Sequence, residues 1–524
     1  PGIVCPVRFL GRQGTAPADR ESGQQCSITR RTYRGASGTS RISQSLERHP
    51  LIENQPGEEL DKGLQGRRLD GEILRLAIPA ILQYLLHTLQ FIVDTRMVSQ
   101  ASGGEDVSLA ALNLVSPLCW SLTTVFTVTA IGASAIVSRR TGENRKDKAS
   151  TATSTALLLA LLIGAVVTLV GITGRETSMV WLEQQLGAAD SDSIASISHD
   201  AEGYLKWFLL LFPLRAVAVT LEATLRGAGE SALPVIGGVV GNIANIVGNA
   251  VLLFGLWGAP RMGLEGVGLA TGLAPLAEIL VIMMVLMVRR TSRLSLSFSG
   301  MFYFDREQSR EIIRVSAPAL GAALLFHSGF VVYQFAIFGL DSTAMAAHRI
   351  AITIQSMAFL PAHGFQAAAA SVSGRLLGAG YQDQAQRSAW RSSYLGVLLV
   401  LPVMVTFFCF AEGLTGLFGM HQETSRIAAT CLMIGAIEVP FLMVSESLTG
   451  TLRGAGANIP VMGITAIGSW GFRVPFAWIL GHGYLGFPEL GLNGIWVATV
   501  LDWVVRSILL ARVISHRDWL KTRV

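Results

Sequence analysis

Asp94 is the residue of this chain best suited to chemistry, because it is a carboxylate inside a long apolar segment. Asp94 and Asn249 each lie 19 residues after a charged residue near the start of their apolar segments. Both would therefore lie roughly 28 Å along their helices, with Asn245 one turn from Asn249 on the same face. A carboxylate beside amide oxygens can bind and release H⁺ or Na⁺, whereas amides only donate or accept hydrogen bonds. Two alternatives remain open: an ion pair with Arg96, or hydration of Asp94 at a membrane interface.

Other ionisable residues inside apolar segments lie at matching depths, which predicts ion pairs that neutralise buried charge. The predicted pairs are Arg215–Glu278, Glu438–Arg473 and Glu446–Arg506. Matching residues by depth in this way leaves Asp502 without a predicted partner. Glu278 and Glu438 are second candidates for ion coupling, and His87 is expected to be a packed neutral histidine.

The composition indicates that lipid surrounds these segments. The 524 residues are 51% hydrophobic and 15% charged, with a mean hydropathy of +0.48, whereas soluble domains carry about 25% charged residues. Six runs lack Asp, Glu, Lys and Arg: 107–138, 149–174, 231–260, 315–340, 350–374 and 392–411. Each could cross a bilayer, which takes roughly 20 apolar residues, whereas helices of a soluble core would show charged faces at helical spacing.

An internal repeat divides the chain into two homologous halves. The hexapeptide "TLRGAG" occurs at 224–229 and again at 451–456, and each copy closes the fourth apolar segment of its half. Because six segments precede the second half, both halves enter the membrane in the same sense, as in a parallel repeat. The residues assigned to the two structural turns are Arg226, Gly227 and Gly229 in the first copy, and Arg453, Gly454 and Gly456 in the second. We therefore predict an all-α integral membrane protein with twelve transmembrane helices in two homologous six-helix lobes.

The predicted organisation begins with an N-terminal extension over 1–70, which is rich in Ser, Gly, Gln and Arg. This composition is typical of disorder, and the extension is either a targeting segment or a misassigned start. The first lobe is expected over 71–290, a linker over 291–309, the second lobe over 310–513 and a C-terminal tail over 514–524. Basic residues concentrate in the linker, in the C-terminal tail, and in the loops after the second and eighth segments, which places both termini in the cytosol.

Four motifs carry a resemblance to a known family. They are "VDTRMVSQ" after the first segment, "SRRTGENRKDKA" after the second, "LRGAG" closing the fourth and tenth, and "GFRVPFAWILG" in the eleventh. In this order, and with the duplication, the chain resembles the multidrug and toxic compound extrusion (MATE) transporters. It is most similar to their DNA-damage-inducible-type and general multidrug efflux branch.

The resemblance implies a secondary antiporter that exchanges H⁺ or Na⁺ for organic, often cationic, molecules through a cavity between the lobes. The chain departs from the family's usual pattern at three places. Arg96 and the Ser99–Gln100 pair replace a small residue and Gly-His, Asn249 stands where many members carry Asp, and His327 lies nearest to where one branch carries Glu. These departures leave the choice between H⁺ and Na⁺ open.

An exporter or flippase of an amphiphilic, lipid-linked or specialised metabolite is the alternative function on the same fold. Such a protein should line its cavity with several cationic residues. An enzyme is not expected, because the sequence shows no Ser/His/Asp constellation, no P-loop and no cluster of metal-ligating residues. The expected partners are the lipid bilayer and a small organic substrate, with no nucleic acid, no cofactor besides the transported ion, no bound metal, and a monomeric state. The expected location is the bacterial inner membrane, or a plastid envelope if 1–70 is a transit peptide.

Overall fold

A computed structural model describes residues 66–101, 107–174, 191–288, 294 and 303–522. Nearly all of the predicted N-terminal extension and most of the predicted linker lie outside the described residues. The described residues form helices and contain no strand. They have the all-α architecture that the apolar segments predict.

The first half of the chain contains seven α-helices and one short 3₁₀ helix among its described residues. They are α2 (Arg67–Ala101), α3 (Val107–Gly142), α4 (Lys146–Thr173), α6 (Ser191–Leu210), α7 (Phe212–Ala228), α8 (Ala232–Phe254), η1 (Leu256–Gly258) and α9 (Gly263–Val288). α6 and α7 meet at a bend of 53°, where Pro213 at the start of α7 cannot donate a backbone hydrogen bond.

The second half repeats this order with more interruptions. Its elements are α10 (Arg306–Phe338), α11 (Ser342–Gln355), η3 (Ser356–Ala358), α12 (Phe359–Gly378), α13 (Gln382–Cys409), α14 (Ala411–Gly416), α15 (Gln422–Gly454), α16 (Asn458–Ala466), η4 (Ile467–Arg473), α17 (Val474–His482), η5 (Tyr484–Gly486), α18 (Gly491–His516) and η6 (Asp518–Lys521). The η4 segment is π-helical and joins α16 to α17. Each of the six uncharged runs overlaps one of these helices or several helices joined by short breaks.

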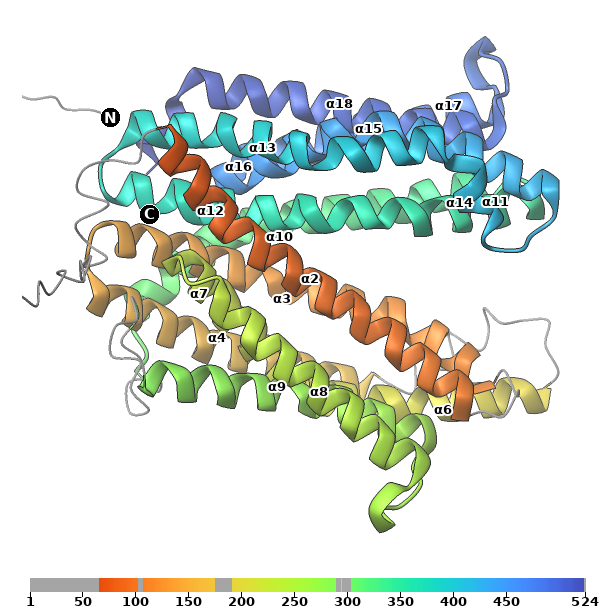
Figure 1. Cartoon of the computed structure of the whole chain (residues 1–524), viewed down its shortest axis with the longest axis horizontal. Coiled ribbons are helices and arrows are strands. Elements are labelled where there is room, and N and C mark those ends of the chain that lie inside the picture. Colours follow the sequence, from red (N-terminus) through yellow and green to blue (C-terminus); the bar gives the residue numbers. More distant parts are fainter. Residues whose placement is uncertain (1–65, 102–106, 175–190, 289–293, 295–302, 523–524) are drawn as a thin grey trace, which may run out of the picture. The chain divides into compact units, whose positions relative to one another are not determined.

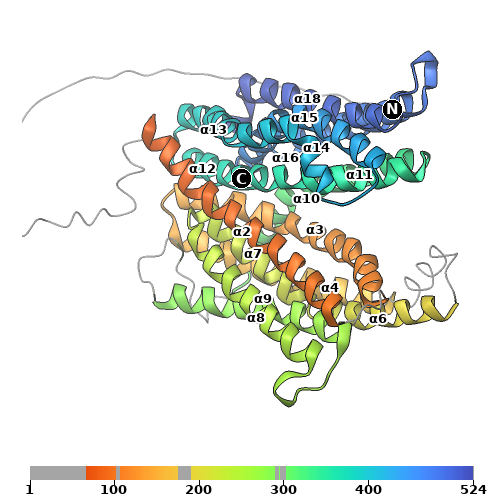
Figure 2. The ribbon, with the colours of Figure 1, turned by 45° about the vertical axis from the view of Figure 1, so that its right-hand side comes forward.

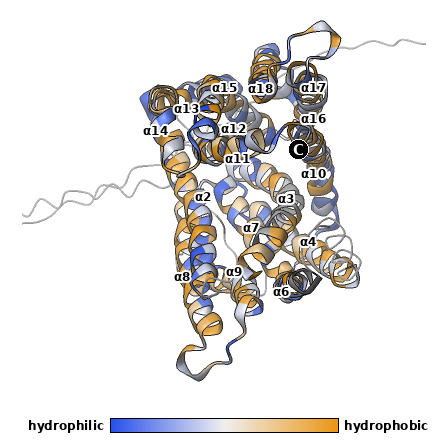
Figure 3. Ribbon diagram, turned by 90° about the vertical axis from the view of Figure 1, so that its right-hand side faces the viewer, coloured by the Kyte–Doolittle hydropathy of each residue, from blue (hydrophilic) through white to orange (hydrophobic). Residues whose placement is uncertain are grey.

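Seven of the described helices are long and apolar enough to cross a membrane, or eight if the bent pair α6–α7 counts as one span. Within the described residues, the other spans of the expected twelve do not meet this criterion of length and composition, so the total of twelve stays a prediction. Large apolar side chains are exposed along α2, including Leu85, Phe91 and Ile92 at 48%, 50% and 57%. Figure 3 shows hydrophobic residues on the helices of both halves. Exposed apolar surface of this extent is expected where helices face lipid.

Helices of each half pack together into a lobe, and the two lobes also contact each other (Figures 1 and 2). In the first lobe α8 packs on α9 and α2, while α7 packs on α3 and α4. In the second lobe α15 packs on α12, α13 and α18. Between the lobes, α2 and α3 contact α12, and α3 also contacts α10. The internal repeat is therefore a repeat of packed six-segment lobes.

The repeat is visible in backbone detail as well. η1 and η5 occupy equivalent places, and each holds a non-glycine residue in the left-handed region, Trp257 at φ 57° and Leu485 at φ 59°. The "LRGAG" turns have their left-handed glycines at Gly229 and Gly456, with φ of 86° and 78°.

Gly227 and Gly454 lie in the last turns of α7 and α15, where they also serve packing. A Cβ at Gly227 would lie 2.7 Å from the Ser134 carbonyl oxygen, and one at Gly454 would lie 2.6 Å from Ser373 Oγ. Both glycines let a neighbouring helix approach closely.

Three predicted boundaries shift by a few residues. α2 begins at Arg67, inside the predicted extension, and α10 begins at Arg306, inside the predicted linker. Asp305 caps α10 by accepting hydrogen bonds from the backbone N–H groups of Glu307 and Gln308 at 2.8 and 3.2 Å. α18 continues to His516, beyond the predicted end of the second lobe.

Candidate ion-coupling site and cavity

Asp94, Asn245 and Asn249 lie together in the first lobe. Asn249 Nδ2 donates to Asp94 Oδ1 at 2.6 Å and to Asn245 Oδ1 at 3.3 Å. Asn245 Nδ2 in turn donates to Thr271 Oγ1 of α9 at 3.2 Å. Asp94 is 8% exposed and both asparagines are fully buried. The result is a buried carboxyl group held by an amide chain that crosses from α2 through α8 to α9.

The alternative ion pair with Arg96 does not form in the part of the chain that the structure describes. Arg96 is exposed, while Asp94 faces the lobe interior and Asn249. Asn249 Oδ1 is buried and has no hydrogen-bond partner among the described residues. The arrangement leaves Asp94 free to take up a proton without breaking an ion pair. Its part in coupling stays a prediction.

A cavity of about 620 Å³ lies beside this site. Its wall includes Tyr204 and Thr271 near the asparagine chain, and His87, Arg215 and Glu278 farther along the lobe. Aromatic side chains of Phe91, Phe208 and Phe212 complete much of the apolar lining. The lining residues belong to the first lobe, apart from Arg349 of α11. The cavity thus lies mainly inside one lobe, with the second lobe contributing at its edge.

Arg215 and Glu278 both line this cavity, but the predicted ion pair between them is wrong. No ion pair joins them in the described residues, and the side chain that reaches Glu278 is Glu222 of α7. Glu222 also pairs with Arg226 at 3.4 Å. Arg215 and Glu222 lie seven residues apart on the same side of α7, about 10 Å along the helix. The depth count failed because it assumed that α7 and α9 start level with each other, and the contact with Glu222 shows that they are offset by about two turns.

In the second lobe the predicted ion pairs Glu438–Arg473 and Glu446–Arg506 are wrong. Both arginines form ion pairs with Asp502 instead. Arg473 Nη2 lies 2.8 Å from Asp502 Oδ2, and Arg506, one turn along α18, also pairs with Asp502. Arg506 Nη2 donates to Ser469 Oγ at 2.7 Å. The π-helical turn of η4 holds both Ser469 and Arg473, and a regular helical count from the sequence cannot anticipate its wider winding.

Glu438 and Glu446 are held by neutral side chains instead. Glu438 accepts from Gln355 Nε2 at 2.6 Å and from Thr499 Oγ1 at 2.8 Å. Glu446 accepts from Gln366 Nε2, and Gln366 Oε1 accepts from Arg453 at 3.1 Å. The glutamines were missed because an amide carries no charge and gives no signal in a search for ion pairs.

The two arginines of the repeated motif point into the protein. Arg226 Nη1 donates to Gln83 Oε1 at 2.6 Å, and Arg453 donates to Gln366. Arg226 also forms its ion pair with Glu222, one turn earlier on the same helix. These arginines therefore tie helices together inside each lobe.

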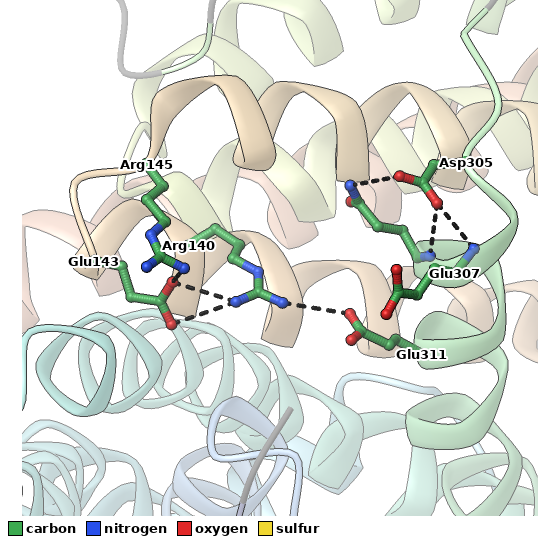
Figure 4. A network of polar contacts seen from close by, with 7 residues as sticks. Arg140, Glu143, Arg145, Asp305, Glu307 and Glu311 are labelled. Atoms are coloured by element: carbon green, nitrogen blue, oxygen red, sulfur yellow. Dashed lines mark hydrogen bonds and ion pairs between the residues drawn. The ribbon is translucent and has the colours of Figure 1, made fainter.

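Ion pairs join the lobes at the end where α2 and α10 begin, called here the linker end. Arg375 Nη2 of α12 lies 2.9 Å from Glu72 Oε1 of α2, and both side chains are largely buried. Arg140 Nη2 of α3 lies 3.5 Å from Glu311 Oε2 of α10 (Figure 4). Arg140 also pairs with Glu143 at 3.2 Å in the same network. These contacts close the linker end, whereas the sequence identified Arg140 and Arg375 only as basic residues near loops.

The described residues contain no group of three or more His, Cys, Asp or Glu side chains that could hold a metal ion. The described cysteines, Cys119, Cys409 and Cys431, are free thiols. The polar groups observed at the Asp94 site are carboxyl, amide and hydroxyl groups.

Comparison with known proteins gives relatives that align over most of the chain. The probable multidrug resistance protein NorM of Thermotoga maritima is 25% identical over 478 residues, which cover 91% of this chain and 98% of that protein. The multidrug resistance protein PmpM of Pseudomonas aeruginosa is 27% identical over 466 residues, covering 87% and 93%.

A solved structure shares the fold. It is described as the outward-facing conformation of a multidrug resistance MATE family transporter of the MOP superfamily. It matches with a TM-score of 0.75 and 22% identity, covering 86% of this chain and 97% of that one. The family model MatE matches residues 79–251 and 318–479, more than half of the chain. The chain therefore belongs to the MATE family and is an integral membrane transporter, not an enzyme.

Proposed function

We propose that this transporter is a secondary antiporter that exports organic, cationic small molecules in exchange for protons. The observation that carries the proposal is Asp94, a buried carboxyl group hydrogen-bonded to Asn249 beside a cavity with aromatic walls. Intramembrane carboxyl groups are costly and usually functional. The multidrug resistance proteins among the relatives support export of organic compounds.

The geometry favours H⁺ over Na⁺ as the coupling ion. Sodium requires several oxygen atoms around it, whereas Asp94 Oδ1 and Asn245 Oδ1 both accept from the Asn249 amide, and of the two asparagine oxygens Asn249 Oδ1 alone has no hydrogen-bond partner among the described residues. A proton needs only one carboxyl oxygen. Exchange then follows if the proton binds the two conformations of the transporter with different affinity.

The same proposal assigns the linker end to the cytosol, because basic residues concentrate there. The ion pair between Glu72 and Arg375 then closes the cytosolic side in this conformation. Both termini would be cytosolic, the membrane would be a bacterial inner membrane, and the protein would act as a monomer without any cofactor beyond the transported ion. We also assign it to the DNA-damage-inducible-type and general multidrug efflux branch of the family.

A second candidate function is export of an anionic amphiphile, such as a lipid-linked metabolite. Arg215 and Arg349 both line the cavity, and Arg215 makes no ion pair with an acidic side chain in the described residues. Two guanidinium groups could bind a phosphate or carboxylate. Measuring transport of an anionic amphiphile and of an organic cation in the same assay distinguishes the two candidate functions.

The test is transport of tetraphenylphosphonium and of an anionic lipid analogue in proteoliposomes with an imposed pH or Na⁺ gradient. Asp94→Asn is compared with Asp200→Asn, a control in α6 that loses a carboxylate hydrogen-bonded to Ser108 instead. We expect a pH gradient to drive cation export in the wild type and the control but not in Asp94→Asn. Equal transport by Asp94→Asn would make Asp94 structural, and transport of the anion alone would replace the first function with the second.

A further inference from the structure

The first lobe contains a pair of touching carboxyl groups that the Asp94 site does not use. Glu222 of α7 is 3% exposed and Glu278 of α9 is 2% exposed. Their side chains lie within hydrogen-bond reach of each other. A hydrogen bond between two carboxyl groups needs a proton on one of them, because an ionised carboxylate only accepts. The pair is therefore a place where this lobe can hold a proton.

The charged groups around the pair differ in how closely they approach it. Arg226 Nη1 of α7 lies 3.4 Å from Glu222 Oε2, and His87 Nε2 of α2 lies 3.9 Å from Glu222 Oε1. Arg215 of α7 acts on both carboxyl groups from a longer distance. The Arg226 guanidinium therefore balances the charge of the Glu222 carboxylate. Glu278 Oε1 is buried and has no hydrogen-bond partner among the described residues.

The side of α8 that packs against Glu278 carries no charge. Gly237 and Gly241 face it, and a Cβ at Gly237 would lie only 3.0 Å from Glu278 Cγ. Gly237 and Gly241 therefore offer Glu278 neither a positive charge nor a side-chain hydrogen-bond donor. An uncompensated carboxylate there would be costly, and a protonated one that donates to Glu222 would not.

The cavity connects this pair to the Asp94 site. Thr271, which accepts from Asn245, and Glu278 both line the cavity and lie two turns apart on α9, about 10 Å along the helix. Asn242 of α8, which lies one turn from Asn245, lines the cavity between them. A cavity of about 620 Å³ has room for the water that carries protons over such a distance.

We propose that Glu222 and Glu278 form a second proton-binding site, so that the first lobe carries two protons per cycle, one at Asp94 and one between these carboxyl groups. The inference rests on the proposed proton antiport. The second proton arrives through the cavity, binds one carboxylate oxygen of the pair, and leaves the same oxygen when the linker end opens. No other bond changes.

The first experiment reads the proton itself by infrared difference spectroscopy of the purified protein across a pH titration. A protonated carboxyl group has a C=O stretching band that a carboxylate lacks. We expect Glu278→Gln to remove one such band. The matched control, Glu265→Gln on the same helix, should leave the spectrum unchanged in this region, because Glu265 is partly exposed and bonds Lys206 and Trp207.

The second experiment measures how many protons are exchanged per tetraphenylphosphonium ion, from the pH gradient that just balances an opposing gradient of the cation. We expect two in the wild type and in Glu265→Gln, and one in Glu278→Gln and in Glu222→Gln. Should Glu278→Gln fail to fold, Glu222→Gln and the wild-type spectrum still decide the matter.

The two proposals fail separately. A wild type that exchanges one proton, with the same value in Glu278→Gln and no band lost, overturns the second site and leaves proton antiport intact. A wild type that exchanges none refutes proton antiport, and the infrared band then shows whether the pair binds a proton at all.

Discussion

Replacing Asp502 by Asn should destabilise the second lobe more than any other single loss of a carboxylate in it. Asp502 is fully buried and is the shared partner of Arg473 and Arg506. The two guanidinium groups that it binds also lie over aromatic rings, with Trp503 about 5.7 Å from Arg473 and 5.0 Å from Arg506. The rings can stabilise a cation, but they cannot replace an anion.

The size of the effect follows from the charge count of this cluster. With Asp502 the three side chains carry a net charge of +1, and after Asp502→Asn they would carry +2. Removing one partner of a buried ion pair costs about 3–5 kcal/mol, and the losses of two pairs that share one residue do not add. At roughly 2–4 °C per kcal/mol for a domain of about 200 residues, the midpoint of thermal unfolding should fall by about 6–20 °C.

The assay is thermal unfolding of the purified protein in detergent, read by the loss of the monodisperse peak in size-exclusion chromatography. Asp518→Asn is the control, because Asp518 and its partner Lys521 are both exposed, and surface pairs contribute little. The double variant Asp502→Asn/Arg506→Gln returns the net charge to +1 and should recover part of the loss. If Asp502→Asn unfolds at the wild-type temperature, or if the double variant is less stable than the single one, the electrostatic reasoning is refuted.

The remaining predictions concern the linker end. Glu72→Gln removes the ion-pair partner of Arg375. If the closed conformation loses about 1–2 kcal/mol, the ratio of closed to open linker ends falls by a factor of 5–30. Distances between spin labels placed on the two lobes at this end should then lengthen. Gly142→Ala should open the same end by steric means, because its Cβ would lie 2.8 Å from the Arg375 carbonyl carbon. Gly413→Ala, where no atom lies within 4 Å, should leave those distances unchanged, and unchanged distances in both test variants would show that these contacts do not hold the lobes together.

Local sequence signals were enough to predict the helices and the repeat. Apolar run length and the two "TLRGAG" copies depend only on neighbouring residues, so the segments and lobes follow from them. Asp94, Asn245 and Asn249 were also brought together correctly, since depth in a membrane restricts a residue to one layer and the two asparagines share a helical face.

The side-chain partners inside each layer could not be predicted in the same way. Depth counted from the helix ends assumes that neighbouring helices start level, so it matches Glu278 to Arg215, whereas Glu222, two turns farther along α7, reaches it. The depth count leaves Asp502 without a partner because it compares residues on different helices and matches Arg506 to Glu446. In the structure Arg506 pairs with Asp502, one turn away on the same helix. Ion pairs between lobes, such as Glu72–Arg375, depend on tertiary packing that no segment contains by itself.

One helix, α2, connects the proposed proton sites to the contacts that close the linker end. Asp94 lies near one end of α2, and Glu72 holds Arg375 near the other end. Between them, His87 and Gln83 face the Glu222–Arg226 pair. Asp94 and Glu72 are 22 residues apart, about 33 Å along a straight helix.

Pro79 inside α2 gives the helix a place where its two parts can move by different amounts. Pro79 lies between Glu72 and Gln83 and removes one backbone hydrogen bond. A change of protonation that shifts or rotates α2 would therefore act directly on the Glu72–Arg375 pair. Glu438, the second-lobe candidate for coupling, accepts hydrogen bonds from Gln355 and Thr499 and has no comparable link to α2 in the described part of the chain. The two lobes thus share a fold, while the first carries the exchangeable protons in the proposed cycle.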